Sequence, residues 1–252
     1  MRYRLSAIVL TCALAAPAAA QPQPPGAPQQ PPWKPKNLQF FPQDITREAL
    51  TQRMREFSFA LSVRCQYCHA GGDGVSFEGV DFSSDEKTAK KKARAMLKMN
   101  DEINKTLLPK IPSRTEPIVE VNCATCHRGR RTPKALQTVL FEIVQTEGAA
   151  AAVSKYKELR ADMTMGVYNF GQWEIMELAR RLVEAKNTAA AIAILEMNGE
   201  YYPKAAEIDF QIAELHLARG EKDKARQRYT ITIEKAPNHQ AARARLAELE
   251  KQ

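Results

Sequence analysis

The residues best suited to chemistry in this sequence are two copies of the motif Cys-x-x-Cys-His, at Cys65–His69 and at Cys123–His127. This motif is the attachment signature of c-type haem. Two thiols on one tight turn can each form a thioether with a haem vinyl group, and the histidine that follows can bind the iron from the same side. The sequence therefore predicts two haems c, with covalent attachment through Cys65, Cys68, Cys123 and Cys126 and with His69 and His127 as the proximal iron ligands.

Three other uses of paired cysteines compete with haem. Zinc accepts paired Cys-x-x-Cys motifs, but it does not require a histidine at the same offset in both copies. A thioredoxin-like dithiol needs a strand before the motif and a helix after it within a sheet fold, and the sequence has no such pattern. Two disulfides would have poor geometry at this spacing and would leave both histidines unexplained. These comparisons favour haem.

A count of the histidines points to the remaining iron ligands. The chain has four histidines, of which two lie in the motifs, while His216 and His239 lie far downstream. Methionine is then the natural distal ligand, since its thioether is a common partner of histidine on haem iron. Three methionines lie between the N-terminal linker and the second motif, namely Met54, Met96 and Met99.

An amphipathic helix is predicted over residues 46–63, directly before the first motif. Its apolar side chains recur at i, i+4 and i+7, and Thr46 can cap its N-terminus. Met54 precedes Cys65 by eleven residues, or about three helical turns, so both residues point to the same side of the helix axis. Met54 is therefore the candidate distal ligand of the first haem, although a methionine that only packs on an apolar stripe would have the same spacing.

A second helix is predicted to start after Ser83 and to continue to about Leu107, because Ser83 and Glu86 have the spacing of a capping box. Met96 lies on the apolar face of this helix, and Met99 lies one turn further on, slightly off that face. Met96 is the candidate distal ligand of the second haem and Met99 is the fallback. Both could instead be core residues, or the second iron could keep an open position.

Three stretches around these residues resemble the cytochrome c subunit of photosynthetic reaction centres, a family in which a helix with the methionine ligand precedes the Cys-x-x-Cys-His turn. The stretches are Met54–His69, Ala93–Asn104 and Val121–Gly129, within about residues 38 to 134. The resemblance implies two pairs of axial ligands, Met54 with His69 on the first iron and Met96 with His127 on the second.

The sequence also departs from that family. The family holds four haems in two similar halves, whereas this chain has one such half. Residues 97–122 contain no histidine that could serve a bis-histidine haem. The sequence therefore resembles soluble two-haem relatives of the reaction-centre subunit more than a reaction-centre component, and a role in photosynthesis does not follow.

The N-terminus has the layout of a secretory signal. Arg2 and Arg4 precede an apolar run over residues 5–16, and small residues up to Ala20 offer a cleavage site. The run is too short to span a bilayer, and no later segment has the character of a membrane span. Residues 21–37 are rich in Pro and Gln, which predicts a solvated linker. We therefore expect export to the periplasm and cleavage after Ala20.

The C-terminal region, residues 135–252, is rich in Ala, Glu, Lys, Arg and Leu with helical periodicity. Pro203 and Pro237 are thirty-four residues apart, which is the period of tetratricopeptide repeats. Lys186 and Asn198 depart from that pattern, where a glycine and a small residue are usual, and a plain helical bundle is the alternative. Small and large positions recur at the same distance, pairing Ala179 with Ala213, Ala191 with Ala225 and Leu195 with Tyr229.

The formal net charge is +8, and part of the positive charge clusters in the second predicted helix. Such a cluster can bind nucleic acid, a membrane surface or an acidic protein. An exported chain seldom meets nucleic acid, so the choice is between a solvated helix face and a surface that steers an acidic redox partner. The cluster consists of Lys87, Lys90, Lys91, Lys92 and Arg94.

The sequence as a whole predicts an all-α protein with two folded domains. The expected parts are a signal peptide at 1–20, a linker at 21–37, a dihaem cytochrome c domain with few long helices at 38–134, and a tetratricopeptide-like repeat domain at 135–252.

The predicted function is single-electron transfer between donor and acceptor proteins in the periplasm, with the repeat domain docking a protein partner. One alternative is a dihaem peroxidase-like enzyme, in which one iron lacks a distal protein ligand. Another is a haem-based redox sensor or scaffold that signals through the repeat domain. Association of two chains to recreate a four-haem array stays open.

Overall fold

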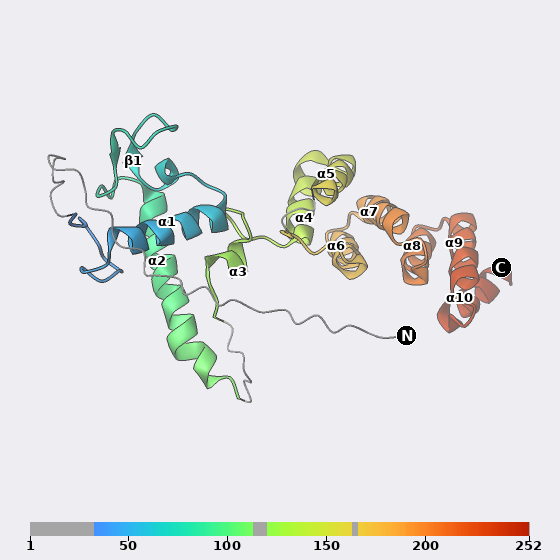
Figure 1. Cartoon of the computed structure of the whole chain (residues 1–252). Helices are drawn as coiled ribbons and strands as arrows, with labels where there is room; N and C mark the ends of the chain where they lie inside the picture. The colour runs from blue at the N-terminus through green and yellow to red at the C-terminus, as the bar shows by residue number, and fades with distance from the viewer. Residues whose placement is uncertain (1–32, 113–119, 163–165, 252) are drawn as a thin grey trace, which may run out of the picture. The chain divides into compact units, whose positions relative to one another are not determined.

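The computed structural model describes residues 33–112, 120–162 and 166–251, which are mostly helical (Figure 1). The all-α prediction is therefore confirmed. The predicted signal peptide and most of the predicted linker lie outside the described residues. Lys36–Gln252 form one compact unit, separate from Met1–Pro35. The expected boundary at residue 134 stays a prediction.

The part of the chain that holds both motifs has two longer helices joined by short elements. Its elements are α1 (Arg47–Leu61), the 3-10 turn η1 (Cys65–Tyr67), strands β1 (Ala70–Gly71) and β2 (Val80–Asp81), α2 (Thr88–Glu102), the π-helical turn η2 (Ile103–Leu107), the 3-10 turn η3 (Leu108–Lys110) and α3 (Cys123–His127).

The first predicted helix is present with the predicted cap. Thr46 Oγ1 accepts a hydrogen bond from Ala49 N at 3.2 Å, which satisfies one of the free N–H groups at the start of α1. The helix ends where Ser62 adopts a left-handed conformation, with a φ of 50°. This end places the first motif only three residues beyond α1.

The predicted start of the second helix is wrong, because the Ser83 side chain is used elsewhere. Ser83 lies in the loop after β2, where its Oγ donates to the Asp81 carboxylate at 2.7 Å. Helix α2 begins at Thr88 instead. Its helical path continues through the π-helical turn η2 and reaches Leu107, as the sequence predicted.

Strands β1 and β2 form a small antiparallel ribbon directly after the first motif, with Gly71 opposite Val80. Gly71 has a φ of 75°, and a Cβ atom there would come within 2.2 Å of the Gly79 carbonyl oxygen. Only glycine allows this close approach of two backbones.

The C-terminal part consists of consecutive helices. They are α4 (Leu136–Glu147), α5 (Ala149–Ala161), α6 (Gln172–Glu184), α7 (Thr188–Tyr201), α8 (Ala206–Ala218), α9 (Lys222–Lys235) and α10 (Gln240–Glu250). Neighbours in the chain pack together as pairs, α4 with α5, α6 with α7 and α8 with α9, and successive pairs also touch.

The predicted thirty-four-residue period is visible in the helix bounds. Helices α8 and α9 begin and end thirty-four residues after α6 and α7, and α10 begins thirty-four residues after α8. The six positions paired in the sequence are all buried. Assignment of these helices to tetratricopeptide repeats stays a prediction.

The two departures from the repeat pattern have structural explanations. Lys186 adopts a left-handed conformation with a φ of 62°, as does Gly220 one period later with a φ of 76°. A glycine is usual at this position because the backbone is left-handed there. Asn198 is fully buried, and its side chain donates to the Gln172 carbonyl at 3.0 Å.

In the part of the chain that the structure describes, no helix has the length and the apolar character needed to cross a membrane.

Alanine substitutions at Gly220 and at Gly199 should change the free energy of unfolding in opposite directions. Gly220→Ala should lower the free energy of unfolding by about 1 kcal/mol, because a residue with a Cβ disfavours the left-handed backbone. Steric clashes do not contribute, since no atom lies within 4 Å of the new Cβ. Gly199→Ala is the matched control inside α7, where the new Cβ would make ordinary contact with Ile208 at 3.8 Å. It should raise stability by about 0.5–1 kcal/mol. Urea unfolding followed by circular dichroism measures both, and a loss of stability in both variants would contradict the backbone explanation.

Candidate haem sites

The first motif forms a single tight turn. The backbone N–H groups of Cys68 and His69 both donate to the Cys65 carbonyl, at 3.1 and 3.0 Å. This turn holds the two thiols and the imidazole close together in the chain. Both cysteines are half-buried and neither is in a disulfide.

The surroundings of the His69 imidazole favour its neutral form. The Phe82 ring packs against it with a centroid distance of 5.0 Å. Burial and, next, the charge of Lys90 lower the pKa of His69. The Phe82 carbonyl acts in the opposite direction, but no hydrogen bond of acceptable geometry reaches the buried Nδ1 atom. A neutral imidazole is the form that binds iron.

The second motif forms the short helix α3, and two reciprocal hydrogen bonds cap its N-terminus. The Asn122 side chain accepts from Thr125 N at 3.1 Å, and Thr125 Oγ1 accepts from Asn122 N at 3.0 Å. This capping box fixes the turn that holds Cys123 and Cys126.

The hydrogen bond of His127 determines which of its nitrogens is available. Its Nδ1 atom lies 2.7 Å from the Arg130 carbonyl oxygen. A carbonyl can only accept, so Nδ1 holds a hydrogen, and in the neutral imidazole Nε2 is then the nitrogen with a lone pair for iron. A backbone acceptor on the second nitrogen is the usual way in which a protein orients a histidine ligand.

Two of the four motif thiols have a raised pKa. Burial and, next, the neighbouring Cys65 raise the pKa of the Cys68 thiol. Burial likewise raises the pKa of Cys123. A redox dithiol instead reacts through a thiolate of lowered pKa, so these shifts do not favour that use. Among the described residues, no three His, Cys, Asp or Glu side chains are grouped so that they could hold a metal ion.

The two motifs are held together by contacts across the chain. Helix α3 packs against α1, and Gly129 N donates to the Ala60 carbonyl at 2.9 Å. The Arg131 guanidinium lies over the ring of Tyr67, 5.7 Å from its centroid, and Tyr67 is part of the first motif. Helix α1 therefore directly precedes the first motif in the sequence and packs against the second motif.

Asn104 connects the end of the second helix to the second motif. Its side-chain amide donates to the Val121 carbonyl at 2.7 Å, and its side-chain oxygen accepts from Val121 N at 2.8 Å. This pair of bonds resembles the pairing of two strands. It fixes the backbone two residues before Cys123, a role that the sequence did not reveal.

The candidate methionines differ in exposure. Met54 is half-buried on α1, while Met96 and Met99 on α2 are 41% and 48% exposed. The possibility that Met96 and Met99 are core residues is therefore not supported. Which methionine pairs with which histidine stays a prediction.

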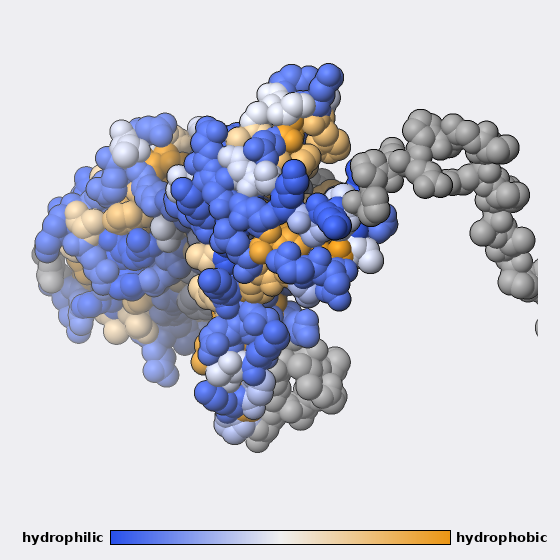
Figure 2. All heavy atoms as spheres, turned by 90° about the vertical axis from the view of Figure 1, so that its left-hand side faces the viewer, coloured by the Kyte–Doolittle hydropathy of each residue, from blue (hydrophilic) through white to orange (hydrophobic). Residues whose placement is uncertain are grey.

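The apolar side chains around the motifs fit a large apolar cofactor. Before Leu136, the only apolar residues buried among the described ones are Ala60 and Ala70. Apolar patches are visible on the surface in Figure 2. An apolar macrocycle tethered at each motif would cover such side chains. The large exposed ones in this part include Phe59, Tyr67, Val75, Phe77, Phe82, Leu107 and Ile111.

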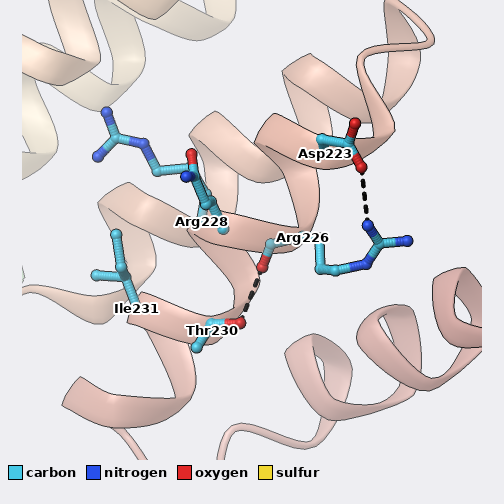
Figure 3. Close-up of a pocket in the computed structure, with 6 residues that line it drawn as sticks. Asp223, Arg226, Arg228, Thr230 and Ile231 are labelled. Carbon is cyan, nitrogen blue, oxygen red and sulfur yellow. Dashed lines mark hydrogen bonds and ion pairs between the residues drawn. The ribbon is translucent and has the colours of Figure 1, made fainter.

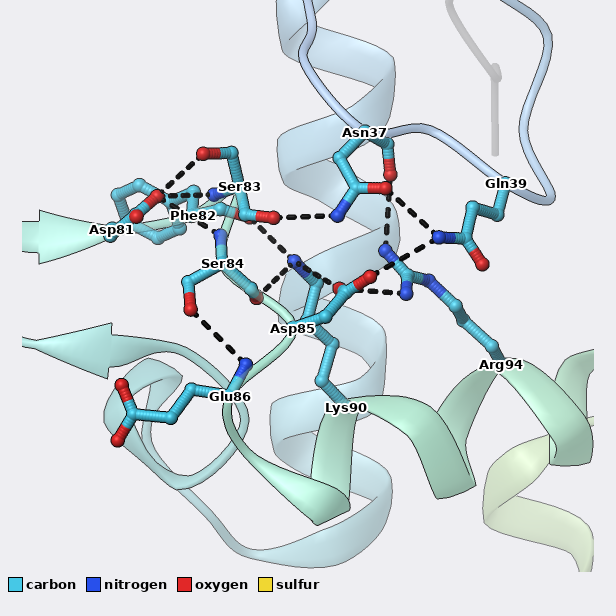
Figure 4. A network of polar contacts seen from close by, with 10 residues as sticks. All are labelled: Asn37, Gln39, Asp81, Phe82, Ser83, Ser84, Asp85, Glu86, Lys90 and Arg94. Carbon is cyan, nitrogen blue, oxygen red and sulfur yellow. Dashed lines mark hydrogen bonds and ion pairs between the residues drawn. The ribbon is translucent and has the colours of Figure 1, made fainter.

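The basic cluster of α2 is divided between internal contacts and solvent. The Lys87 ammonium donates to the Gln66 carbonyl within the first motif. Lys90 is buried and bonds to the loop after β2, and Arg94 donates to Asp85 at 2.7 Å (Figure 4). Lys87, Lys90 and Arg94 have an i, i+3, i+7 spacing, which is visible in the sequence and indicates one face of a helix. The prediction of a solvated face fits only Lys91 and Lys92, which are exposed.

A hollow on α9 is a weaker candidate site (Figure 3). Arg226 in this hollow donates to Asp223 at 2.8 Å, and Arg228 donates to Asp209 and Glu196, each at 2.9 Å. Its arginines are therefore already paired with carboxylates. The residues that line it are Asp223, Arg226, Gln227, Arg228, Thr230 and Ile231.

A comparison with protein families finds a match over more than half of the sequence. The model of the family described as photosynthetic reaction centre cytochrome C subunit matches residues 13–172. The match extends beyond the two motifs and through α4 and α5. No curated protein matches the chain.

Asn104→Ala should destabilise the part of the chain around the second motif. The change removes two hydrogen bonds and leaves the Val121 backbone without these partners, which should cost about 1–3 kcal/mol. Thermal unfolding of the purified holoprotein measures the loss. Asn100→Ala, one helical turn earlier on α2, is the matched control and should have little effect. Equal losses of thermal stability in the two variants would contradict a stabilising role for the Asn104–Val121 hydrogen bonds.

Stability should fall at acidic pH through Asp85. The hydrogen bond from Arg94 holds the pKa of this carboxyl well below its ordinary value. The stabilisation by the ionised Asp85 carboxylate is therefore complete above the unfolded-state pKa of about 3.9, and it is lost progressively as the pH falls below that value. Asp85→Asn should be less stable near neutral pH and should lose less stability on acidification. Urea unfolding at several pH values tests this, with Asp44→Asn at an exposed carboxylate as the control. If Asp85→Asn lost as much stability on acidification as the wild-type protein, the effect could not be attributed to Asp85.

Proposed function

Because the chain belongs to the photosynthetic reaction centre cytochrome c subunit family, we propose that it is an exported two-haem electron carrier. The family implies covalently bound c-type haem and a haem-based electron-transfer role. The number of haems, the periplasmic location and the ligands are our proposals. The observation that supports them best is the pair of Cys-x-x-Cys-His turns, both supported by α1.

Each residue type has a distinct role in this proposal. Cys65, Cys68, Cys123 and Cys126 tether the two haems, and His69 and His127 bind the irons from the proximal side. Haem supplies one-electron chemistry by cycling its iron between the ferric and ferrous states. A thioether from Met54 or Met96 favours the ferrous state, which raises the reduction potential relative to a second histidine.

The partners in this proposal are an electron donor and an electron acceptor protein. Within the basic cluster of α2, Lys91 and Lys92 are the exposed charges available to an acidic partner. The helical pairs of the C-terminal part are proposed to dock a further protein, because stacked helical repeats present extended surfaces.

The first experiment is a haem count with an absorption spectrum. The pyridine haemochrome of the purified exported protein should give two haems c per chain. The oxidised protein should show the weak near-infrared band of methionine bound to ferric iron. One haem per chain, or a high-spin spectrum without this band, would overturn the two-haem carrier and favour the peroxidase-like enzyme or the sensor.

Replacement of the methionines should identify the distal ligands. Met54→Ala and Met96→Ala should each convert one of the two haems to high spin, because each removes one axial ligand. Met99→Ala is the control on α2 and should leave both haems low-spin. Electron paramagnetic resonance of the oxidised variants measures the spin state. A high-spin haem in Met99→Ala together with a normal spectrum in Met96→Ala would transfer the assignment to Met99.

A further inference from the structure

Lys90 is the one buried residue of α2, although the sequence places it in a run of lysines. Its ammonium donates to the Phe82 carbonyl at 2.9 Å and to the Ser84 carbonyl at 2.7 Å, and it lies 3.3 Å from the Asp85 carboxylate (Figure 4). A lysine is rarely buried unless its charge is used or compensated. These bonds fasten the loop that follows β2 to the first turn of α2.

This loop covers the proximal histidine of the first motif. Phe82, whose carbonyl Lys90 holds, packs its ring against the imidazole of His69 at 5.0 Å. Lys90 therefore positions the side chain that shields His69. Movement of the loop away from α2 would expose the proximal side of the first site to water.

The charge of Lys90 also acts on the first motif. Its ammonium is held 2.9 Å from the carbonyl oxygen of Phe82, and the Phe82 ring contacts the His69 imidazole, so this cation lies close to the first motif.

The charges around Lys90 do not cancel. The Asp85 carboxylate is shared between Lys90 and Arg94, at 3.3 and 2.7 Å, so one carboxylate faces two cations. Lys87, bonded to the Gln66 carbonyl, is a third cation, and Asp81, which accepts from the Ser83 and Ser84 N–H groups, is the second carboxylate. A net positive charge therefore remains beside the first motif, where burial weakens its screening by water and salt.

We propose that Lys90 selectively raises the reduction potential of the haem bound at the first motif, as a buried positive charge and as the positioning residue of Phe82. This inference rests on the proposed two-haem function. The step affected is the one-electron reduction of ferric to ferrous iron, with the electron supplied by the donor protein. The charge at the iron falls by one in this step, so a nearby cation favours the reduced state.

The test is a redox titration of the full-length holoprotein followed by absorption. Lys90→Met removes the charge but keeps a long side chain, and it should lower one of the two reduction potentials while the other stays unchanged. Lys91→Met, at the adjacent exposed lysine, is the matched control and should leave both potentials unchanged. Lys90→Arg keeps the charge and should restore most of the shift.

A second variant separates the effect of charge from a general loosening of the loop. Asp85→Asn removes the counter-charge and leaves Lys90 in place, so it should raise the same potential that Lys90→Met lowers. Loosening of the loop would instead shift the potential in the same direction in both variants. If Lys90→Met fails to retain two haems, Asp85→Asn decides, and an unchanged or lowered potential in that variant overturns the proposal.

The affected haem can be identified by its spectrum. Cys68→Ala leaves the first haem with one thioether and one free vinyl group, which moves its absorption bands to longer wavelength. The potential that changes in Lys90→Met should belong to the haem with the displaced bands, and the opposite assignment would overturn the proposal. Failure of the two-haem function would already be evident in the wild-type haem count, so the two failures are distinguishable.

Discussion

The part of the chain that holds both Cys-x-x-Cys-His motifs lacks an apolar core of its own among the described residues. Ala60 and Ala70 are the only buried apolar residues among the described ones before Leu136, and large apolar side chains such as Phe59 and Phe77 are exposed. Apolar burial is the dominant favourable contribution to folding, so a large apolar group held by the motifs would supply what this part lacks. A covalently bound macrocycle would serve as the core as well as the redox centre. The same constraint explains why polar contacts hold the remaining elements in place.

Those polar contacts join segments that lie far apart in the sequence. Gly129 bonds to the end of α1, Asn104 clamps Val121, and the Asn37 side chain donates to the Ser83 carbonyl at 2.6 Å. Each contact fixes one motif, or the loop beside it, to a segment that is distant in the sequence. The positions of the two histidines therefore depend on a few specific hydrogen bonds. Individual substitutions in this part should have sharply different effects.

The C-terminal helices are stabilised differently. They bury two clusters of apolar residues, one with Leu178 and Ile194 and one with Tyr229, all at 0% exposure. Their contacts join mainly neighbouring helices, as is usual in repeat architectures. The six positions that the sequence period pairs are accordingly all buried. Even the exception at Lys186 follows the period, since its left-handed backbone matches that of Gly220.

The sequence by itself determined the two attachment motifs, the all-α class, helix α1 with its Thr46 cap and the thirty-four-residue period, because each depends on residue types at short spacing. The tertiary structure decided the burial of Lys90, the use of Ser83 in a loop rather than a helix cap, and the clamp between Asn104 and Val121. Each of these depends on a partner that only the folded chain brings within hydrogen-bonding distance. A lysine in a basic run has the same local pattern whether it is solvated or buried, and the difference arises from the carbonyl groups that the loop after β2 places around it.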